Sequence, residues 1–221
     1  MENEIKDKIL NLFIDSDDLR SMDKPFTRPG KTYATNGHVL VSIDGKDERY
    51  LESKINVERV IPEEQGHSRI IIIDELRAAL DSIPKVEKME TVESDCNECG
   101  GEGLTVCSEC EQERDCPECK GEGKLSLPSK PTGIFIEDES EKACILIDEA
   151  MFRAFYARKL IVVADILGIK SITRKTESHP TKANLFYFTD ELFVLLMSMR
   201  YESKDGTVSL NRYEVKNETK L

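Results

Sequence analysis

The sequence predicts an α+β fold in which helices pack on antiparallel sheet, with a cysteine-rich zinc arm inserted into the chain. Helix-like and strand-like patterns come in blocks, a helix followed by strands, and not in the regular alternation that builds a parallel sheet. Turn residues such as Asn36-Gly37 separate the short strand patterns, which is typical of hairpins. We therefore expect a main domain in two parts, residues 1–90 and 126–221, around a zinc-binding arm at 91–125.

The N-terminal part of the chain predicts one helix and one hairpin. Residues 2–14 have a helical pattern, and four apolar side chains share its face: Ile5, Ile9, Leu12 and Phe13. Charges, two prolines and a glycine then end the helix within residues 15–30. Residues 31–45 predict two strands around the Asn36-Gly37 turn.

The middle of the chain predicts a short helix and two extended segments that flank the cysteines. Residues 55–62, INVERVIP, look extended, and Asp74 is expected to cap a helix that Pro84 ends. Its apolar stripe is Leu76, Ala79, Leu80 and Ile83. Residues 86–94 and 124–127 also look extended, so we expect them to enter and leave the cysteine-rich stretch from the same side.

The C-terminal part predicts a hairpin, a long helix and further strands. Residues 133–138 and 142–147 are expected to pair with each other, and Asp148 is expected to cap a helix that runs through Leu167 and stops at Gly168. Strands are then predicted in four segments: 169–175, 183–188, 192–201 and 207–215.

Six of the seven cysteines form three C-x-x-C pairs within residues 96–123: Cys96/Cys99, Cys107/Cys110 and Cys116/Cys119. A C-x-x-C turn brings two sulfurs together, and two such turns supply the four thiolates of a tetrahedral zinc site. Glycines follow two of the pairs, at 101 and 103 and at 121 and 123, where they let backbone N–H groups approach the sulfurs. The alternative is a set of disulfides, which paired C-x-x-C spacing disfavours.

The double C-x-x-C-x-G-x-G pattern resembles the cysteine-rich zinc domain of DnaJ-type co-chaperones. The resemblance implies that the first and last pairs form one site, made of Cys96, Cys99, Cys116 and Cys119. Cys107 and Cys110 are left without a second pair, so they complete a site with a carboxylate or another subunit, or they stay reduced. Cys144 lies in the apolar run ACILI and is expected to be a buried small side chain.

The charge distribution favours a protein partner for the arm. The chain carries a net charge of −12, and acidic residues are concentrated between Glu93 and Glu122. Binding to phosphates requires cations, so this stretch does not suit nucleic acid. No apolar run approaches the roughly 20 residues of a membrane span, and the N-terminal MENEIKDK lacks secretory character, so we expect a cytoplasmic protein.

Three segments resemble bacterial sliding clamps, the beta subunit of DNA polymerase III, and they occur in that family's order. They are TYATNGHVLVSI at 32–43, INVERVIP at 55–62 and FVLLMSMRY at 193–201. Short phage-like clamp relatives show a similar layout. The resemblance implies a non-enzymatic ring around DNA that recruits replication proteins through a peptide-binding pocket, and a chain this short closes a ring only as a homo-oligomer. The cations expected to face DNA are Arg153, Arg158, Lys159, Arg77 and Lys8.

Two other functions remain open from the residues. The first is a DnaJ-type protein-binding module, although the chain has no His-Pro-Asp tripeptide of a J-domain. The second is an acidic, phage-type inhibitor that occupies a host protein. An enzyme is not expected, because neither a phosphate-binding loop nor a nucleophile motif is present and the three histidines lack partners at ligand-like spacing.

Overall fold

The computed structural model describes residues 1–14, 22–62, 68–107, 112–138, 143–148, 150–176 and 183–199, and the backbone of one strand at 211–214. Its internal contacts divide the chain into two compact units. We call them the main unit, Met1–Pro84 and Asp138–Leu221, and the hairpin unit, Lys85–Glu137. Helices and antiparallel sheets are both present, so the predicted α+β class is confirmed.

The main unit is built on a seven-stranded antiparallel sheet with the order β1-β2-β3-β13-β12-β11-β4. Two blocks of three strands, β1 to β3 and β11 to β13, meet where β13 pairs with β3. The strands are β1 (Phe26–Arg28), β2 (Lys31–Thr35), β3 (Val39–Asp44), β4 (Ser68–Ile72), β11 (Ser171–Thr176), β12 (Ala183–Thr189) and β13 (Leu192–Met197). A smaller sheet contains β10 (Ala150–Arg153), β9 (Ala143–Ile147) and β14 (Asn211–Glu214), with β14 parallel to β9.

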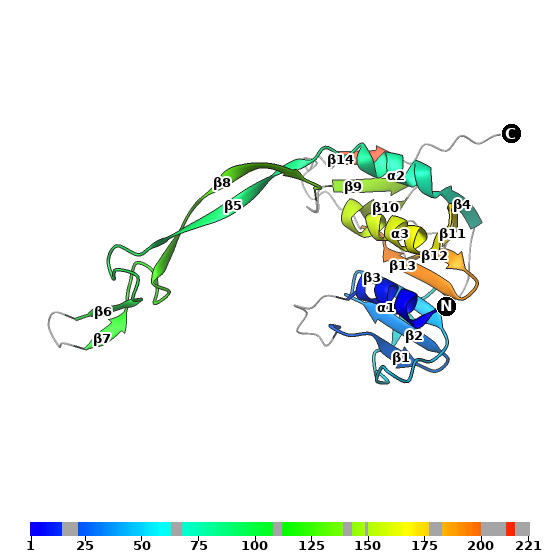
Figure 1. Ribbon diagram of the computed structural model, residues 1–221, viewed down its shortest axis with the longest axis horizontal. Coiled ribbons are helices and arrows are strands. Elements are labelled where there is room, and N and C mark those ends of the chain that lie inside the picture. Colours follow the sequence, from blue (N-terminus) through cyan, green and yellow to red (C-terminus); the bar gives the residue numbers. More distant parts are fainter. Residues whose placement is uncertain are drawn as a thin grey trace. The chain divides into compact units, whose positions relative to one another are not determined.

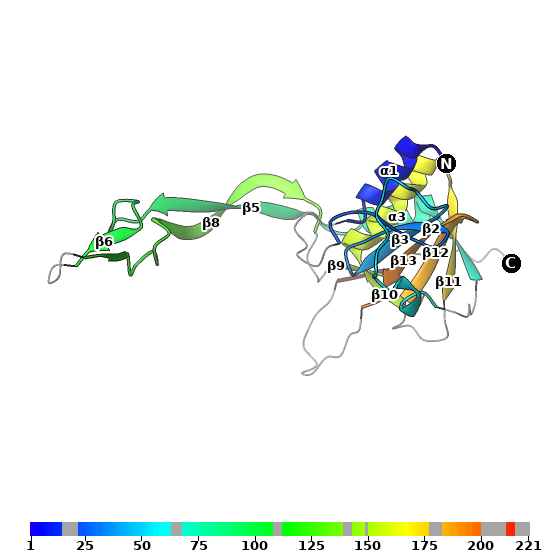
Figure 2. The same cartoon turned by 90° about the horizontal axis from the view of Figure 1, so that it is seen from below.

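Three helices cover one face of the large sheet: α1 (Asn3–Asn11), α2 (Ile73–Asp81) and α3 (Ala154–Leu167) (Figure 2). Helix α3 contacts both of the others. The main hydrophobic core lies between this layer and the strands, where alternate residues of β3 and β13, such as Val41 and Val194, are fully buried against helix residues such as Leu10 and Leu160. Period-2 alternation in the strands and helical spacing in α1 to α3 thus build a single core.

The opposite face of the same sheet carries a second, smaller core. Side chains of β1, β2, β3, β12 and β13 gather there with Val57 and, at the margin, Ile55 and Ile61. Residues Val57–Arg59 form a 3-10 turn, so the prediction that 55–62 is extended is wrong at its centre. The turn brings Val57 onto the sheet, and burial of this side chain in the second core stabilises the turn.

The hairpin unit consists of two short antiparallel ribbons (Figure 1). The longer one pairs β5 (Val86–Asp95) with β8 (Lys124–Ile136), and the shorter one pairs β6 (Leu104–Val106) with β7 (Glu113–Asp115). In the described part of this unit, the buried cluster is made of cysteines, with Leu125 and Cys99 packed against it. The described residues of this unit therefore supply no aliphatic core to stabilise it.

Several predicted element boundaries are wrong, each for an identifiable reason. Helix α2 begins at Ile73, so Asp74 lies in its first turn and does not cap it. Asp148 does not cap α3 either: it occupies the tight turn between β9 and β10 with φ of 55°, and the helix begins after Arg153. Aspartate is favoured both at helix N-caps and in tight turns, and here Asp148 lies in the turn because β9 and β10 pair with each other.

The expected hairpin between residues 133–138 and 142–147 is also wrong. Strand β8 pairs with β5, whereas β9 pairs with β10 and β14, so the two segments belong to different units. Strand β1 was not among the predicted strands and lies in the segment that was predicted to end the first helix. Within the described residues, none of the helices has the length and apolar character that a membrane crossing requires.

Candidate metal centre

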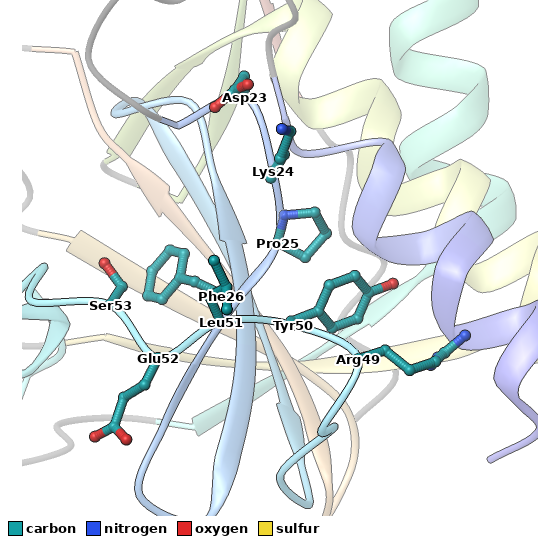
Figure 3. Close-up of a pocket in the computed structure, with 9 residues that line it drawn as sticks. All are labelled: Asp23, Lys24, Pro25, Phe26, Arg49, Tyr50, Leu51, Glu52 and Ser53. Carbon is teal, nitrogen blue, oxygen red and sulfur yellow. The ribbon is translucent and has the colours of Figure 1, made fainter.

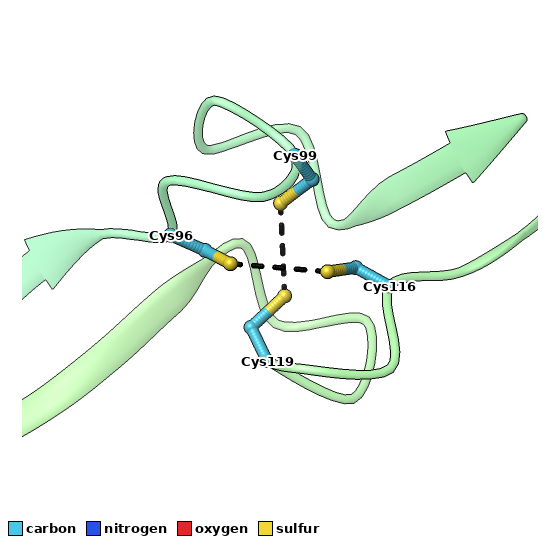
Figure 4. A group of neighbouring side chains, drawn as sticks. All are labelled: Cys96, Cys99, Cys116 and Cys119. Carbon is cyan, nitrogen blue, oxygen red and sulfur yellow. Dashed lines mark hydrogen bonds between the residues drawn. The ribbon is translucent and has the colours of Figure 1, made fainter.

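Four thiols of the hairpin unit converge on one point: those of Cys96, Cys99, Cys116 and Cys119 (Figure 4). Their sulfur atoms all lie within 4.8 Å of one another. Cys96 Sγ lies 3.8 Å from Cys116 Sγ, and Cys99 Sγ lies 3.7 Å from Cys119 Sγ. These are the first and last C-x-x-C pairs, the four residues that the DnaJ resemblance places in one site.

The sulfur spacing fits a tetrahedral metal site. A zinc ion with Zn–S bonds of about 2.3 Å requires sulfurs about 3.8 Å apart, the edge of the tetrahedron. A disulfide instead requires about 2.05 Å, and all four cysteines are free. The group can therefore hold a metal ion, and its four-thiol donor set suits a structural site with no open position.

The two knuckles support each other through their backbones in a nearly symmetrical way. The N–H of Cys96 donates to the carbonyl of Gly123 at 2.8 Å, and the N–H of Cys116 donates to the carbonyl of Gly103 at 2.7 Å. Each glycine also donates its own N–H to a sulfur, Gly103 to Cys99 and Gly123 to Cys119, both at 3.2 Å. Such donors stabilise thiolate charge and orient the ligands.

At positions 103 and 123 both the backbone conformation and the lack of room for a Cβ atom require glycine. Their φ angles are +79° and +74°, and a Cβ on either would lie 2.4 Å or 2.2 Å from a carbonyl oxygen of the other knuckle. The position after the second cysteine differs: Gly100 has φ of +62° with open space around it, and the matching Lys120 accepts φ of 54°. The close approach of the knuckles therefore depends on Gly103 and Gly123, each four residues after the second cysteine of its pair, and not on every glycine.

The thiols have opposing pKa shifts. Burial raises the pKa of Cys96 to about 12 and also raises that of Cys119. Burial acts on Cys99 in the same sense, but N–H donors from Gly103 and Gly101 outweigh it and lower the pKa of that thiol to about 7. The Cys99 thiol therefore ionises at a lower pH than the thiols of Cys96 and Cys119, and metal binding at these two would release protons.

The middle pair is not part of this cluster. Cys107 is half-buried, its N–H donates to the carbonyl of Gln112 at 3.0 Å, and its sulfur is not among the four that converge. Cys110 lies outside the described residues. Cys144 of the main unit is fully buried, with its sulfur 3.3 Å from the sulfur of Met199.

The five cations expected to face DNA all belong to the helix layer of the main unit or its border. Lys8 is on α1, Arg77 on α2, Arg158 and Lys159 on α3, and Arg153 at the residue before α3. Arg153 was expected inside the long helix but ends β10, where its guanidinium lies over the Tyr156 ring. The DNA-facing role of these residues stays a prediction.

The same cations have partners within the chain. Arg77 pairs with Asp165 at 2.6 Å and Lys8 with Glu4 at 2.7 Å. Arg158 contacts Asp81 at 3.5 Å and donates to the carbonyl of Leu80 at 2.9 Å, and Lys159 donates to the carbonyl of Leu12 at 2.5 Å. A phosphate on this face would have to compete with these acceptors.

A pocket of about 550 Å³ lies beside β1, at a place where no sequence pattern predicted a site (Figure 3). It forms because residues 51–53 run alongside β1, with the N–H of Thr27 donating to the carbonyl of Leu51 at 2.9 Å. Arg49 and Tyr50 close one wall and both contact Asp7 of α1. Leu51 is 87% exposed at this pocket, which makes it the most exposed large apolar side chain of the described residues.

Comparison with known proteins finds likeness to solved structures alone. No protein family matches the chain, and no curated protein is similar to it. A DnaN sliding clamp (DNA polymerase III subunit beta) from Pseudomonas aeruginosa is 14% identical, with a TM-score of 0.47, over 88% of this chain and 62% of that one. A sliding clamp from Bacillus subtilis is 10% identical, with a TM-score of 0.48, over 90% and 63%. Caulobacter crescentus pol III beta is 14% identical, with a TM-score of 0.46, over 89% and 65%. The chain spans less than two thirds of each of these proteins.

Proposed function

We propose that this chain is a clamp-like DNA scaffold that assembles as a homo-oligomer around DNA and recruits replication proteins, with a zinc-stapled hairpin unit for protein contacts. One observation carries the proposal. The three segments that resemble sliding clamps are separate in the sequence, and the third lies in the C-terminal part, yet they meet at one place in the main unit.

The meeting place is the second core, on the face of the sheet opposite the helices. The first segment supplies β2 and β3, and the third supplies β13, which pairs with β3 from Leu192–Ile43 to Leu196–Val39. The second segment adds Val57 to the same cluster as Leu40 and Leu195. Three local resemblances thus describe a single packed region, as expected if they share one origin.

The edges of the seven-stranded sheet support assembly. At one end, β4 has β11 as its single strand neighbour within the described part of the chain, and it exposes Ile70 by 65% and Ile72 by 39%. At the other end, Leu51 projects beside β1. Apolar side chains at two different edges suit head-to-tail contacts, which close into rings when the rotation between subunits allows it.

Zinc is the metal that we assign to the four-cysteine site. Four thiolates in a closed tetrahedron are typical of structural zinc, and the cysteine cluster is the core that the described residues of the hairpin unit form. Cys96, Cys99, Cys116 and Cys119 would hold the ion, whose role is to fix the two knuckles together. Cys107 and Cys110 would bind a second ion only with ligands from elsewhere.

Two measurements on the purified protein test the scaffold proposal. Light scattering coupled to gel filtration gives the stoichiometry, and retention on circular but not on linearised DNA reports encirclement. Ile70→Asp should convert the oligomer to a monomer, because it places a charge in the apolar edge. Val162→Asp is the matched control, since Val162 is 40% exposed on α3, away from the sheet edges. A wild-type protein that is monomeric at all concentrations would refute the ring.

The second candidate is an acidic protein that occupies a host protein without binding DNA. The observation that favours it is the pairing of Arg77, Arg158 and Lys8 with carboxylates inside the chain. This candidate predicts no retention on either form of DNA at physiological salt. The same DNA experiment therefore decides between the two functions.

A further inference from the structure

We propose that the open edge of β5 is a docking site for an extended, lysine- or arginine-rich strand of a partner protein, which would add a third strand to the β5–β8 ribbon. Among the described residues, β5 has β8 as its single strand neighbour (Figure 1). The main-chain N–H and C=O groups along its other edge therefore have no strand partner. A row of such groups is a template for strand addition.

The ribbon itself favours an added strand. Most residues of both strands are exposed, so neither face of the ribbon is covered by the described part of the hairpin unit. Isolated two-stranded ribbons are marginally stable in water. A third strand would supply backbone hydrogen bonds and cover exposed apolar side chains of β5 such as Met89 and Val86, which are 53% and 40% exposed.

The two edges of the ribbon are not equivalent. Strand β8 contains Pro128 and Pro131, which have no N–H to donate, and Gly133 with φ of +74°. Its register against β5 shifts twice, between Glu87 and Met89 and between Glu90 and Val92. Strand β5 is ten residues long and has no proline or glycine. The structure thus protects the β8 edge and leaves the β5 edge open.

Charge selects the kind of strand that fits. Strand β5 carries four carboxylates against the single cation Lys88: Glu87, Glu90, Glu93 and Asp95. Strand β8 offsets part of this charge, with Lys130 opposite Glu90 and Lys124 at 3.4 Å from Glu93. Opposite charges on neighbouring strands stabilise a sheet and like charges destabilise it. A basic strand is therefore favoured at this edge.

A second copy of the chain fits less well than a basic partner. Pairing β5 with β5 would bring carboxylates of one copy against those of the other. Pairing β5 with β8 of another copy would meet Pro128 and Pro131. The partner strand is therefore expected to come from a different protein, with lysine or arginine alternating with β-branched residues.

The test uses the full-length, zinc-loaded protein and a fluorescein-labelled peptide, KVTVKVTVKV, followed by fluorescence anisotropy. Reversing Glu90 and Glu93 to lysine should weaken binding by at least about tenfold. The matched control reverses Glu98 and Glu122, two exposed carboxylates of the same unit outside β5, and should change binding less than about twofold. Equal losses in both variants would overturn the proposal, because they would show attraction by overall charge.

A second pair of probes separates strand addition from charge alone. Two versions of the peptide carry N-methyl groups on alternate residues, one on the odd and one on the even positions. Only one set of amides can face β5, so one version should lose binding and the other should keep it. Equal affinity of both versions would refute strand addition. So would a dimer of the protein alone that the lysine reversals dissociate, because it would show that a second copy occupies this edge. The inference does not depend on assembly around DNA.

Discussion

The metal site should be most sensitive to a single added methyl group at Gly103 and Gly123, each the fourth residue after its C-x-x-C pair. In Gly123→Ala the new Cβ would lie 2.2 Å from the carbonyl oxygen of Gly101, so the backbones must separate by most of an ångström to reach a normal contact. Alanine at φ of +74° adds about 1–2 kcal/mol of backbone strain. The shift would also displace the N–H that donates to Cys119.

We expect Gly123→Ala to lower the affinity for zinc by roughly 10–100-fold, the usual effect of losing a group that orients a ligand. Gly100→Lys is the control, because it places a lysine at φ of +62° with nothing within 4 Å, as Lys120 already does in the other knuckle. Competition with a chromophoric chelator measures both affinities, and cobalt substitution reports tetrahedral thiolate ligation. Wild-type affinity in Gly123→Ala would refute the tight double knuckle.

Three further predictions concern stability. Cys119→Ser should unfold the hairpin unit, because the cysteine cluster is the core of the hairpin unit, and should leave the unfolding transition of the main unit in place. Calorimetry of the wild-type protein and the variant, both with zinc, would show this difference. Loss of both transitions together in the variant would contradict it. Arg49 holds the pKa of Asp7 and Asp47 below the ordinary value, so these carboxylates stabilise the fold above about pH 4 and less as the pH falls. Asp47→Asn should therefore lower the free energy of unfolding by about 2–4 kcal/mol at pH 7, because Lys6 loses its buried partner. Urea titrations at several pH values should also show that this free energy falls less steeply toward acid pH in the variant. An unchanged pH dependence would contradict the prediction. Phe186→Ala should cost about 3–5 kcal/mol, because Phe186 is fully buried against Phe152, and a chemical denaturation curve within 1 kcal/mol of the parent would be inconsistent with this core.

Periodic patterns and fixed spacings were the predictable part of this protein. The helical face of residues 2–14, the hairpin at Asn36-Gly37 and the stop at Gly168 all follow from local sequence, and the structure has α1, β2 with β3, and the left-handed Gly168 at these places. The four cysteines that the DnaJ resemblance places in one site also converge.

Long-range pairing was not predictable in the same way. Residues 133–138 and 142–147 are neighbours in sequence with matching strand patterns. The end of β8 nevertheless pairs with the start of β5, about 50 residues earlier in the chain, as in the pair Val86–Ile136. The pocket beside β1 depends on residues 51–53 meeting Thr27, and neither segment has a pattern of its own. Register between distant segments is decided by the whole fold, and local propensity carries little of that information.

The reciprocal bonds between the knuckles have a consequence for engineering. The N–H of Cys96 donates to Gly123, and the N–H of Cys116 donates to Gly103. These bonds join the two knuckles at the base of the segment between them, which contains β6 and β7. A loop closed at its base can change in length at its tip with little entropic cost. The segment between the knuckles is therefore a natural graft site, where an epitope or a fluorophore tag could replace native residues while the register of β5 and β8 stays fixed.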